Sequence, residues 1–177
     1  MIRPNHQTII GLKFFEDLFK NSKARDPDNN PLMVFHGTPY RFKKFDKSLI
    51  GSQTDQGMYG QGFYFSTSKL EASKYGKYVM AHYLIMNKPF ELDAYESLPG
   101  KMKELGLIHE GNGEINHFGK LTATSKKMTD ILKENGYDGV IKQDLYGAHE
   151  YIAFEASQIM PISMPNPKQK QEIALSR

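Results

Sequence analysis

Three side chains with useful chemistry stand at the edges of short apolar segments. His36 carries an imidazole that can donate or accept a hydrogen bond near neutral pH. Tyr64 lies in the glycine-rich segment 60–66 and offers a flat ring for stacking on a ligand. Glu150 could stabilise a developing positive charge or accept a proton. Taken alone, His36 is better explained by core packing and Glu150 by an exposed strand start, and Tyr64 could also pack in the core, so only the joint pattern of the three residues carries weight.

Composition narrows the chemistry that such residues could perform. The 177 residues, 39% of them hydrophobic, suffice for one core and one domain. The absence of cysteine excludes disulfides, thiolate catalysis and Cys-ligated zinc. The histidines at 82, 109, 117 and 149 lack the paired spacing of zinc ligands, so we expect no metal.

Charge and hydropathy narrow the range of partners. The 23 Lys and Arg and 20 Asp and Glu are scattered along the chain, so nucleic acid is a permitted partner that the sequence does not specifically indicate. No segment approaches the roughly 20 apolar residues of a membrane span, and we expect no membrane partner.

Helices are predicted in three places. Apolar residues recur at helical spacing over 8–20, and 121–135 is followed by Gly136, a residue that favours a helix end. Ser68 with Glu71 three residues later predicts a capping box for a helix that reaches about Tyr75. The segment 94–120 is interrupted by glycines and receives no assignment.

Strands are predicted where short runs of aromatic and aliphatic residues lie between turn residues. These runs are 32–36, 63–65, 78–86 with 89–92 continuing it, 139–142, 150–154 and 158–162. Because the helices and strands do not alternate regularly, we expect an α+β fold with a mainly antiparallel sheet.

Four short motifs occur in a fixed order: FHGTP at 35–39, GQGFYF at 60–65, SKY at 73–75 and EYIAF at 150–154. This set resembles the diphtheria-toxin-like ADP-ribosyltransferases, the branch with a His, Tyr, Glu triad that also includes poly(ADP-ribose) polymerase catalytic domains. A closer resemblance is to the ADP-ribosyltransferase domains of polyvalent proteins from bacteriophages and mobile elements. The similarity to these domains includes three further segments of this sequence: the upstream FKNSKARDPDNNPLMVFHGTP, the later GYDGV and the closing SQI.

The resemblance implies an architecture. We expect two packed, mainly antiparallel sheets with a few flanking helices around an NAD cleft. Residues 1–30 would form an N-terminal helix and linker packed on the domain, 31–162 the catalytic domain, and 163–177 a flexible tail.

The resemblance also implies roles for individual residues. Glu150, His36 and Tyr64 would be catalytic, with His36 bonding the adenosine ribose and Glu150 facing the reacting ribose. Tyr64 and Tyr75 would sandwich the nicotinamide ring, and Gly37 would present its backbone to the carboxamide because it has no side chain to obstruct the approach. The remaining predicted NAD contacts are Thr38, Gly62, Phe63 and Ala72.

Other residues near the predicted NAD site differ from the family pattern or have a second interpretation. Ala72 stands where polymerase-like relatives have a serine that binds the carboxamide, and this departure bears on NAD affinity. The loop 45–61 corresponds to the loop that lies over NAD, where Asp55 and Gln56 could contact the dinucleotide. Asp138 is predicted to accept hydrogen bonds from turn amides, and Glu155 is a rival carboxylate on the opposite sheet face from Glu150.

The implied activity is mono-ADP-ribosylation, with NAD as co-substrate, nicotinamide as leaving group and no metal. The expected acceptor is a host protein, with nucleic acid as an alternative, and the expected setting is a monomer in the bacterial cytoplasm, phage-encoded or delivered as an effector. Two other functions stay open: an NAD glycohydrolase, and a catalytically idle binding module or virion-associated protein.

Overall fold

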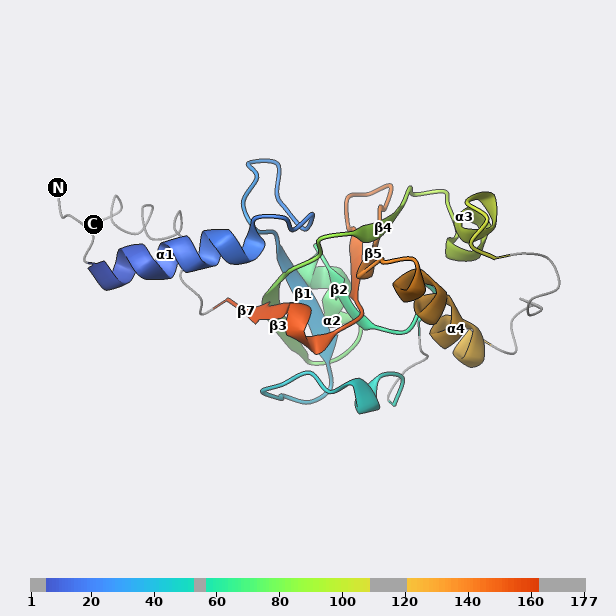
Figure 1. Cartoon of the computed structure of the whole chain (residues 1–177). Coiled ribbons are helices and arrows are strands. Elements are labelled where there is room, and N and C mark those ends of the chain that lie inside the picture. Colours follow the sequence, from blue (N-terminus) through green and yellow to red (C-terminus); the bar gives the residue numbers. More distant parts are fainter. Residues whose placement is uncertain (1–5, 53–56, 109–120, 163–177) are drawn as a thin grey trace.

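A single mixed sheet forms the centre of the protein (Figure 1). The computed structural model describes residues 6–52, 57–108 and 121–162. The sheet has the strand order β4-β5-β6-β2-β1-β3-β7, and only β4 and β5 pair in parallel. The strands are β1 (Met33–Thr38), β2 (Phe63–Ser66), β3 (Tyr78–Leu84), β4 (Pro89–Leu92), β5 (Gly139–Lys142), β6 (Glu150–Ala153) and β7 (Ile159–Pro161).

The α+β class is confirmed, but the described residues form one sheet where two packed sheets were expected. Within this sheet, the pairing between β1 and β2 is short. β1 pairs with β3 at six positions, whereas it pairs with β2 only at Phe35↔Ser66. The pair Phe35↔Ser66 is the one register position at which β2 and β1 are joined. Any other contact between these two strands must involve side chains.

The helices mostly follow the sequence prediction. Helix α1 spans His6–Phe19 and α4 spans Leu121–Glu134, with Gly136 at φ 78° after its end. Ser68 caps α2 (Lys69–Ser73) by accepting from the Glu71 amide, 3.2 Å away. The predicted capping box is only half formed, because the Glu71 carboxylate pairs with Lys74 instead.

One helix was missed by the sequence analysis. Helix α3 (Leu98–Glu104) lies in the unassigned segment and begins at Ser97, whose side chain accepts from the Gly100 amide. Its signal was the Ser-Leu-Pro order, which places a capping side chain just before a proline that is compatible with a first helical turn.

Segment 89–92 does not continue the preceding strand, as had been expected. The chain turns after β3, and β4 pairs with β5 at the opposite edge of the sheet. Asp138 holds this turn by accepting from the amides of Asn87 and Lys88 at 2.6 and 3.1 Å. The predicted structural role of Asp138 is therefore confirmed.

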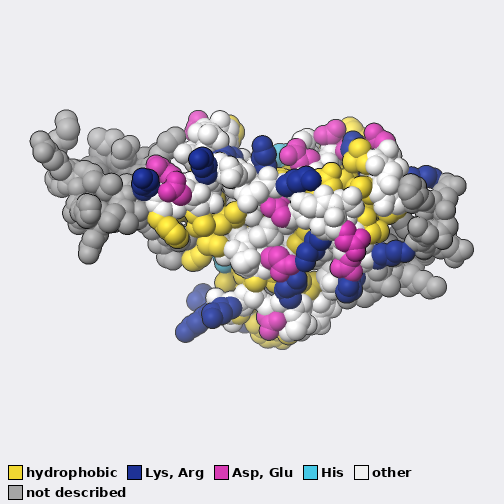
Figure 2. All heavy atoms as spheres, viewed as in Figure 1, with side chains coloured by type: hydrophobic (Ala, Val, Ile, Leu, Met, Phe, Trp, Pro, Cys, Tyr) yellow, Lys and Arg dark blue, Asp and Glu magenta, His cyan; other side chains and the backbone are white. Residues whose placement is uncertain are grey.

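Apolar side chains cover both faces of the sheet. Strand β6 shows the alternation, since Tyr151 and Ala153 enter one buried cluster while Ile152 and the following Phe154 enter another. Helix α4 covers the second face with residues such as Leu132, which is fully buried. On the molecular surface, charged side chains of both signs are interspersed with hydrophobic ones (Figure 2).

The C-terminal half of α1 packs on the opposite end of the sheet. Phe15 and Phe19 meet the ring of Tyr83 at centroid distances of 5.7 and 5.9 Å, and all three side chains are buried. None of the helices in the described ranges has the length and apolar character to cross a membrane.

Candidate functional site

The imidazole of His36 bridges the narrow β1–β2 junction. Its Nδ1 atom lies 2.8 Å from the carbonyl oxygen of Tyr64. Because a carbonyl oxygen only accepts, Nδ1 carries the proton in this bond. The neutral ring therefore presents Nε2 as a hydrogen-bond acceptor.

Aromatic rings surround this imidazole. The rings of Phe42, Phe45 and Phe65 lie at centroid distances of 5.9, 5.1 and 5.5 Å from it. Burial lowers the pKa of His36, and the hydrogen bond to the Tyr64 backbone offsets only part of this effect. His36 is consequently a neutral acceptor, held in a fixed tautomer at neutral pH.

The hydroxyl of Tyr64 is engaged by the loop that precedes β2. It donates to the carbonyl of Gly60 at 2.7 Å and accepts from the amide of Tyr59 at 3.0 Å. Gly57 faces the same hydroxyl so closely that a Cβ there would collide with it, and its φ of 89° also favours glycine. The tyrosine thus fixes the backbone of residues 57–60 beside its own ring.

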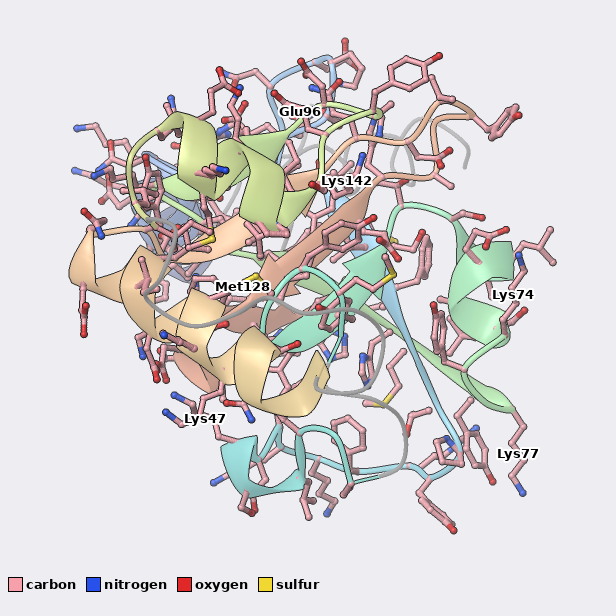
Figure 3. All side chains as sticks on the ribbon, turned by 90° about the vertical axis from the view of Figure 1, so that its right-hand side faces the viewer. Lys47, Lys74, Lys77, Glu96, Met128 and Lys142 are labelled. Carbon is pink, nitrogen blue, oxygen red and sulfur yellow. The ribbon has the colours of Figure 1, made fainter. Side chains whose placement is uncertain are left out.

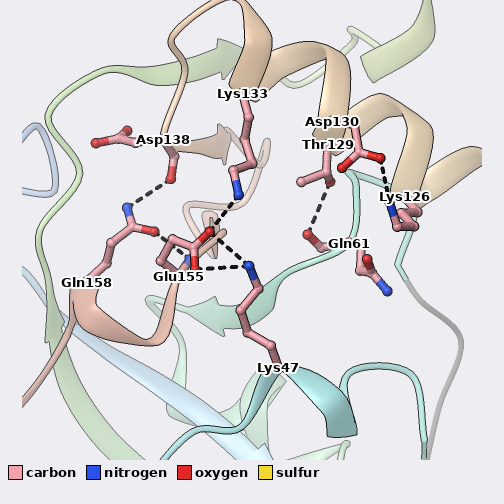
Figure 4. A network of polar contacts seen from close by, with 9 residues as sticks. All are labelled: Lys47, Gln61, Lys126, Thr129, Asp130, Lys133, Asp138, Glu155 and Gln158. Carbon is pink, nitrogen blue, oxygen red and sulfur yellow. Dashed lines mark hydrogen bonds and ion pairs between the residues drawn. The ribbon is translucent and has the colours of Figure 1, made fainter.

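Helix α4 anchors the same loop from the other side. Ser125 donates from its hydroxyl to the carbonyl of Gly57 at 2.6 Å, and its own carbonyl accepts from the Gln61 amide. Thr129 donates to the Gln61 carbonyl at 3.1 Å (Figure 4). Asp55 and Gln56, the two candidate contacts of the dinucleotide in this loop, lie outside the described residues.

Glu150 begins β6, directly opposite Ser66 of β2. Tyr64 is paired with Ile152, so Tyr64 and Glu150 share a sheet face and stand on a diagonal within reach of a large side chain. Burial raises the pKa of Glu150, and the charges of Asp144 and Glu71 raise it further.

A lysine acts in the opposite direction. Lys142 is the cross-strand partner of Glu150 on β5, and its positive charge lowers the pKa of the carboxyl. Its ammonium group donates to the backbone carbonyls of Asp93 and Gln143 at 2.6 and 3.1 Å. Figure 3 shows Lys142 at the end of β5, near Glu96. The lysine therefore supplies a fixed, largely buried positive charge beside a carboxylate that burial disfavours.

Packing requires a glycine at position 37, in addition to the predicted contact with the carboxamide. A Cβ at this position would collide with the backbone carbonyl of Ala72, because α2 packs directly against β1. The close approach places Tyr75, whose side chain is 60% exposed, beside Gly37. Thr38 is buried, and its hydroxyl donates to the Tyr40 carbonyl at 3.1 Å.

The remaining predicted NAD contacts lie against the core. Ala72 and Phe63 are 2% and 5% exposed, and Phe63 packs on Phe45. Gly62 is buried against β6, where a Cβ would stand 2.6 Å from Cγ2 of Ile152. Any contact of these residues with a ligand would therefore involve the backbone more than the side chain.

Three residues near Glu150 escaped the sequence analysis. Tyr59 packs against the same apolar cluster as Tyr64, and burial together with the charge of Glu150 raises the pKa of its hydroxyl. Asp144 and Glu71 act on Glu150 from the β5–β6 loop and from α2. Tyr59 and Asp144 belong to no recognised motif, and Glu71 was predicted only as the partner of Ser68 in a capping box.

Glu155, the rival carboxylate, has a structural environment (Figure 4). It accepts from Lys47 at 2.8 Å and from Lys133 at 2.6 Å, which ties η1 (Lys47–Leu49) to the end of α4. Hydrogen bonding also occupies His149, whose Nδ1 accepts from the Asp144 amide at 3.0 Å. The described residues contain no group of three or more side chains placed to hold a metal ion.

The three triad candidates come from adjacent strands in the order β6-β2-β1. His36 is bonded to the Tyr64 backbone, and Tyr64 shares a face with Glu150. The imidazole itself packs beside Phe65, which points to the face opposite that of Tyr64. The imidazole of His36 and the side chains of Tyr64 and Glu150 therefore lie on opposite faces of the sheet, and a ligand that contacts all three would have to reach both faces at the β1–β2 junction.

Comparison with known proteins identifies the family of the chain. The sequence matches the family described as "ADP-Ribosyltransferase in polyvalent proteins" over residues 26–169, and the chain belongs to this family. No curated protein matches it. Among solved structures, the chain is similar to one titled "Crystal structure of an anti-CRISPR protein", with 14% identity, a TM-score of 0.39, and coverage of 74% of this chain and 93% of that chain.

Proposed function

We propose that the chain transfers ADP-ribose from NAD to a macromolecular acceptor and releases nicotinamide, with Glu150 as the principal catalytic residue. The observation that carries the proposal is the order β6-β2-β1, which brings the strands of Glu150, Tyr64 and His36 together. The family relationship supports the reaction type. NAD has two halves, and the need to reach both faces at the β1–β2 junction suits an extended dinucleotide.

His36 is assigned to the adenosine half. A ribose hydroxyl needs an acceptor, and Nε2 is the acceptor that the Nδ1–Tyr64 bond leaves on the neutral ring. The lowered pKa keeps the ring in this form at neutral pH. His36 would therefore orient the sugar without taking part in proton transfer.

Tyr64 and Tyr75 are assigned to the nicotinamide half. The ring of NAD is cationic before cleavage, and aromatic faces attract a cation. The Tyr64 hydroxyl already bonds the loop, so the proposal uses its ring face. Tyr75 supplies a second, largely exposed ring beside Gly37.

Glu150 is assigned to the reacting ribose. Breaking the bond to nicotinamide leaves positive charge on the ribose. A nearby carboxylate stabilises this cationic transition state more strongly than the uncharged ribose of bound NAD. Burial raises the pKa of Glu150 because its negative charge is poorly solvated. A positive charge that develops on the ribose offsets this penalty. The carboxylate is therefore more stable beside the transition state than in the protein without a ligand.

The test is nicotinamide release from NAD by wild type and Glu150→Gln. We expect the rate constant of the substituted protein to fall about 100-fold with little change in NAD affinity. Glu104→Gln, the same change at an exposed position of α3, is the control and should leave the rate unchanged. Equal rates for wild type and Glu150→Gln would contradict the assignment.

A second measurement separates transfer from hydrolysis. Wild type is incubated with NAD labelled in the ADP-ribose half, with and without a bacterial lysate. Label on a macromolecule supports transfer, whereas label found only in free ADP-ribose would identify an NAD glycohydrolase and overturn the transferase proposal.

A further inference from the structure

The fold concentrates a positive charge that looks scattered in the sequence. Residues 40–44 and 69–78 contain six Lys and Arg against one carboxylate. The whole chain has 23 against 20, so the rest of the chain holds 17 cations against 19 carboxylates. The net positive charge of the protein thus resides in these two segments. Their cations are Arg41, Lys43, Lys44, Lys69, Lys74 and Lys77, all exposed.

The two segments lie side by side. Arg41 and Lys77 each place their cationic group 5.0 Å from the centroid of the Tyr78 ring. Tyr78 pairs with Thr38 in the β1–β3 ladder, and Gly76 approaches the Thr38 backbone so closely that a Cβ would collide with it. The two segments therefore meet at the ring of Tyr78, and their six cations are together called the basic surface, which extends from α2 to the loop after β1.

The figures show the same arrangement. Lys74 on α2 and Lys77 at the start of β3 lie on one side of the molecule, whereas Lys47 lies on the other (Figure 3). Basic side chains project at the lower left of Figure 2, where the loop between β1 and η1 lies in Figure 1.

Exposed aromatic rings accompany this charge. Tyr40 is 66% exposed and Tyr75 60% exposed, and both adjoin the cations in sequence and in space. Rings of this kind, set among cations, are platforms on which unpaired bases stack while the cations contact phosphates. An acidic protein would use the charge but would have no need for exposed rings.

The basic surface reaches the proposed catalytic carboxylate. Glu150 is paired with Ser66 of β2, the Ser66 hydroxyl accepts from the Ser68 amide at 3.0 Å, and Ser68 caps the start of α2. The α2 end of the surface therefore borders the site.

We propose that this surface binds single-stranded nucleic acid and presents it to Glu150 as the acceptor, an inference that rests on the proposed function. In the transfer, the bond between the nicotinamide nitrogen and the ribose carbon breaks, and its electron pair leaves with nicotinamide. A lone pair of a base nitrogen or a terminal phosphate oxygen forms the new bond to that carbon. The acceptor's proton, where it has one, passes to Glu150 or to solvent.

The first experiment measures binding of a fluorescent single-stranded oligonucleotide of roughly 12 nucleotides, as DNA and as RNA. Replacing Lys43, Lys44 and Lys77 with alanine should raise the Kd about tenfold or more at about 0.1 M salt, and should reduce the salt slope by about 2. Replacing Lys103, Lys126 and Lys127 with alanine removes equal charge from α3 and α4 and should change the Kd by less than about twofold. Tyr40→Ala should weaken binding roughly tenfold through lost stacking.

The second experiment tests the acceptor role with labelled NAD. Wild type should attach label to the bound oligonucleotide, and the triple Lys43, Lys44, Lys77 variant should lose this transfer while it still releases nicotinamide. Bound oligonucleotide that stays unlabelled would overturn the proposal. So would the absence of binding, an equal loss in the control variant, or competition by polyglutamate as effective as that by unlabelled oligonucleotide. If wild type released no nicotinamide at all, the proposed function would fail instead, whatever the oligonucleotide does.

Discussion

The Nδ1 atom of His36 bonds the carbonyl oxygen of Tyr64 at 2.8 Å, beside the single register position that joins β1 and β2. One nitrogen of the ring therefore bonds the neighbouring strand, and the other is the acceptor that the proposal assigns to the ribose. This division of roles means that two conservative substitutions of His36 should have different consequences.

His36→Asn retains a side-chain amide that can take the place of Nδ1, whereas His36→Gln extends past the Tyr64 carbonyl and reaches toward the position of Nε2. We expect the glutamine variant to be less stable to urea than the asparagine variant by about 1 kcal/mol, since it leaves a partly buried carbonyl without its donor. His36→Asn should bind NAD more weakly than wild type, because it has no acceptor at the position of Nε2, whereas the amide oxygen of His36→Gln can occupy that position and should retain more of the affinity.

Urea unfolding and NAD titration of the two proteins check this prediction. If the variants had the same free energy of unfolding, the His36–Tyr64 bond would have no structural role. If His36→Asn bound NAD as tightly as wild type, the assignment of Nε2 to the ribose would be wrong.

Glu150 should lower the stability of the protein at neutral pH. Burial and the charges of Asp144 and Glu71 raise its pKa above that of the unfolded chain. The stabilising contribution of its protonated form is fully present below the unfolded-chain pKa of about 4.3, and it is lost as pH rises through the higher folded-state pKa. We therefore expect Glu150→Gln to be more stable than wild type at pH 7, with an advantage that shrinks toward pH 4.

Glu155→Gln is the matched control and should behave in the opposite way. Burial works to raise the pKa of Glu155, but hydrogen bonds from Lys133 and Lys47 outweigh it and lower the pKa. Its contribution is present above the unfolded-chain pKa and is lost as pH falls through the lower folded-state pKa. Because these groups are 40–50% exposed, we expect a loss of about 1 kcal/mol or less at pH 7. Thermal unfolding between pH 4 and 7 measures both effects. If the two variants changed the stability at pH 7 in the same direction, the opposite pKa shifts of Glu150 and Glu155 would be contradicted.

Local patterns predicted the elements well, because each pattern reflects a physical requirement of the element itself. Short aromatic and aliphatic runs at Tyr64 and Glu150 indicated strands, and Ser68 indicated the start of α2; both predictions are confirmed. The capping box failed in part because Glu71 had a choice of partners and pairs with Lys74 at 2.6 Å. A short motif specifies which bonds are possible, and the surrounding side chains decide which of them forms.

Long-range arrangement was less accessible to the sequence. Nothing in segment 89–92 shows that it leaves its neighbour and pairs with β5, since this depends on Asp138 some fifty residues away holding the turn. The single β1–β2 register position and the gathering of Arg41 with Lys77 around one ring are likewise products of topology. The triad strands could be predicted, but the residues that tune Glu150 could not.

Gln158 provides the last prediction, and it explains why the closing SQI segment belongs to the pattern. Its Nε2 donates to the carbonyls of Ile85 and Asp138 at 3.1 and 2.8 Å, while its Oε1 accepts from the Glu155 amide at 2.8 Å (Figure 4). The amide thus joins the end of β3, the entry to β5 and the end of β6. Gln158→Glu keeps the shape but replaces a donor that serves two carbonyls with an acceptor.

We expect Gln158→Glu to lower the free energy of unfolding by about 1–3 kcal/mol, the cost of leaving partly buried polar groups unpaired. Gln143→Glu makes the same chemical change at an exposed position after β5 and should have an effect within about 0.5 kcal/mol. Urea unfolding at pH 7 compares the two. A protonated glutamic acid regains one donor, so the loss of free energy of unfolding in Gln158→Glu should become smaller as pH falls toward 5. A loss that is equal in both variants, or independent of pH, would mean that the amide does not hold these strand ends together.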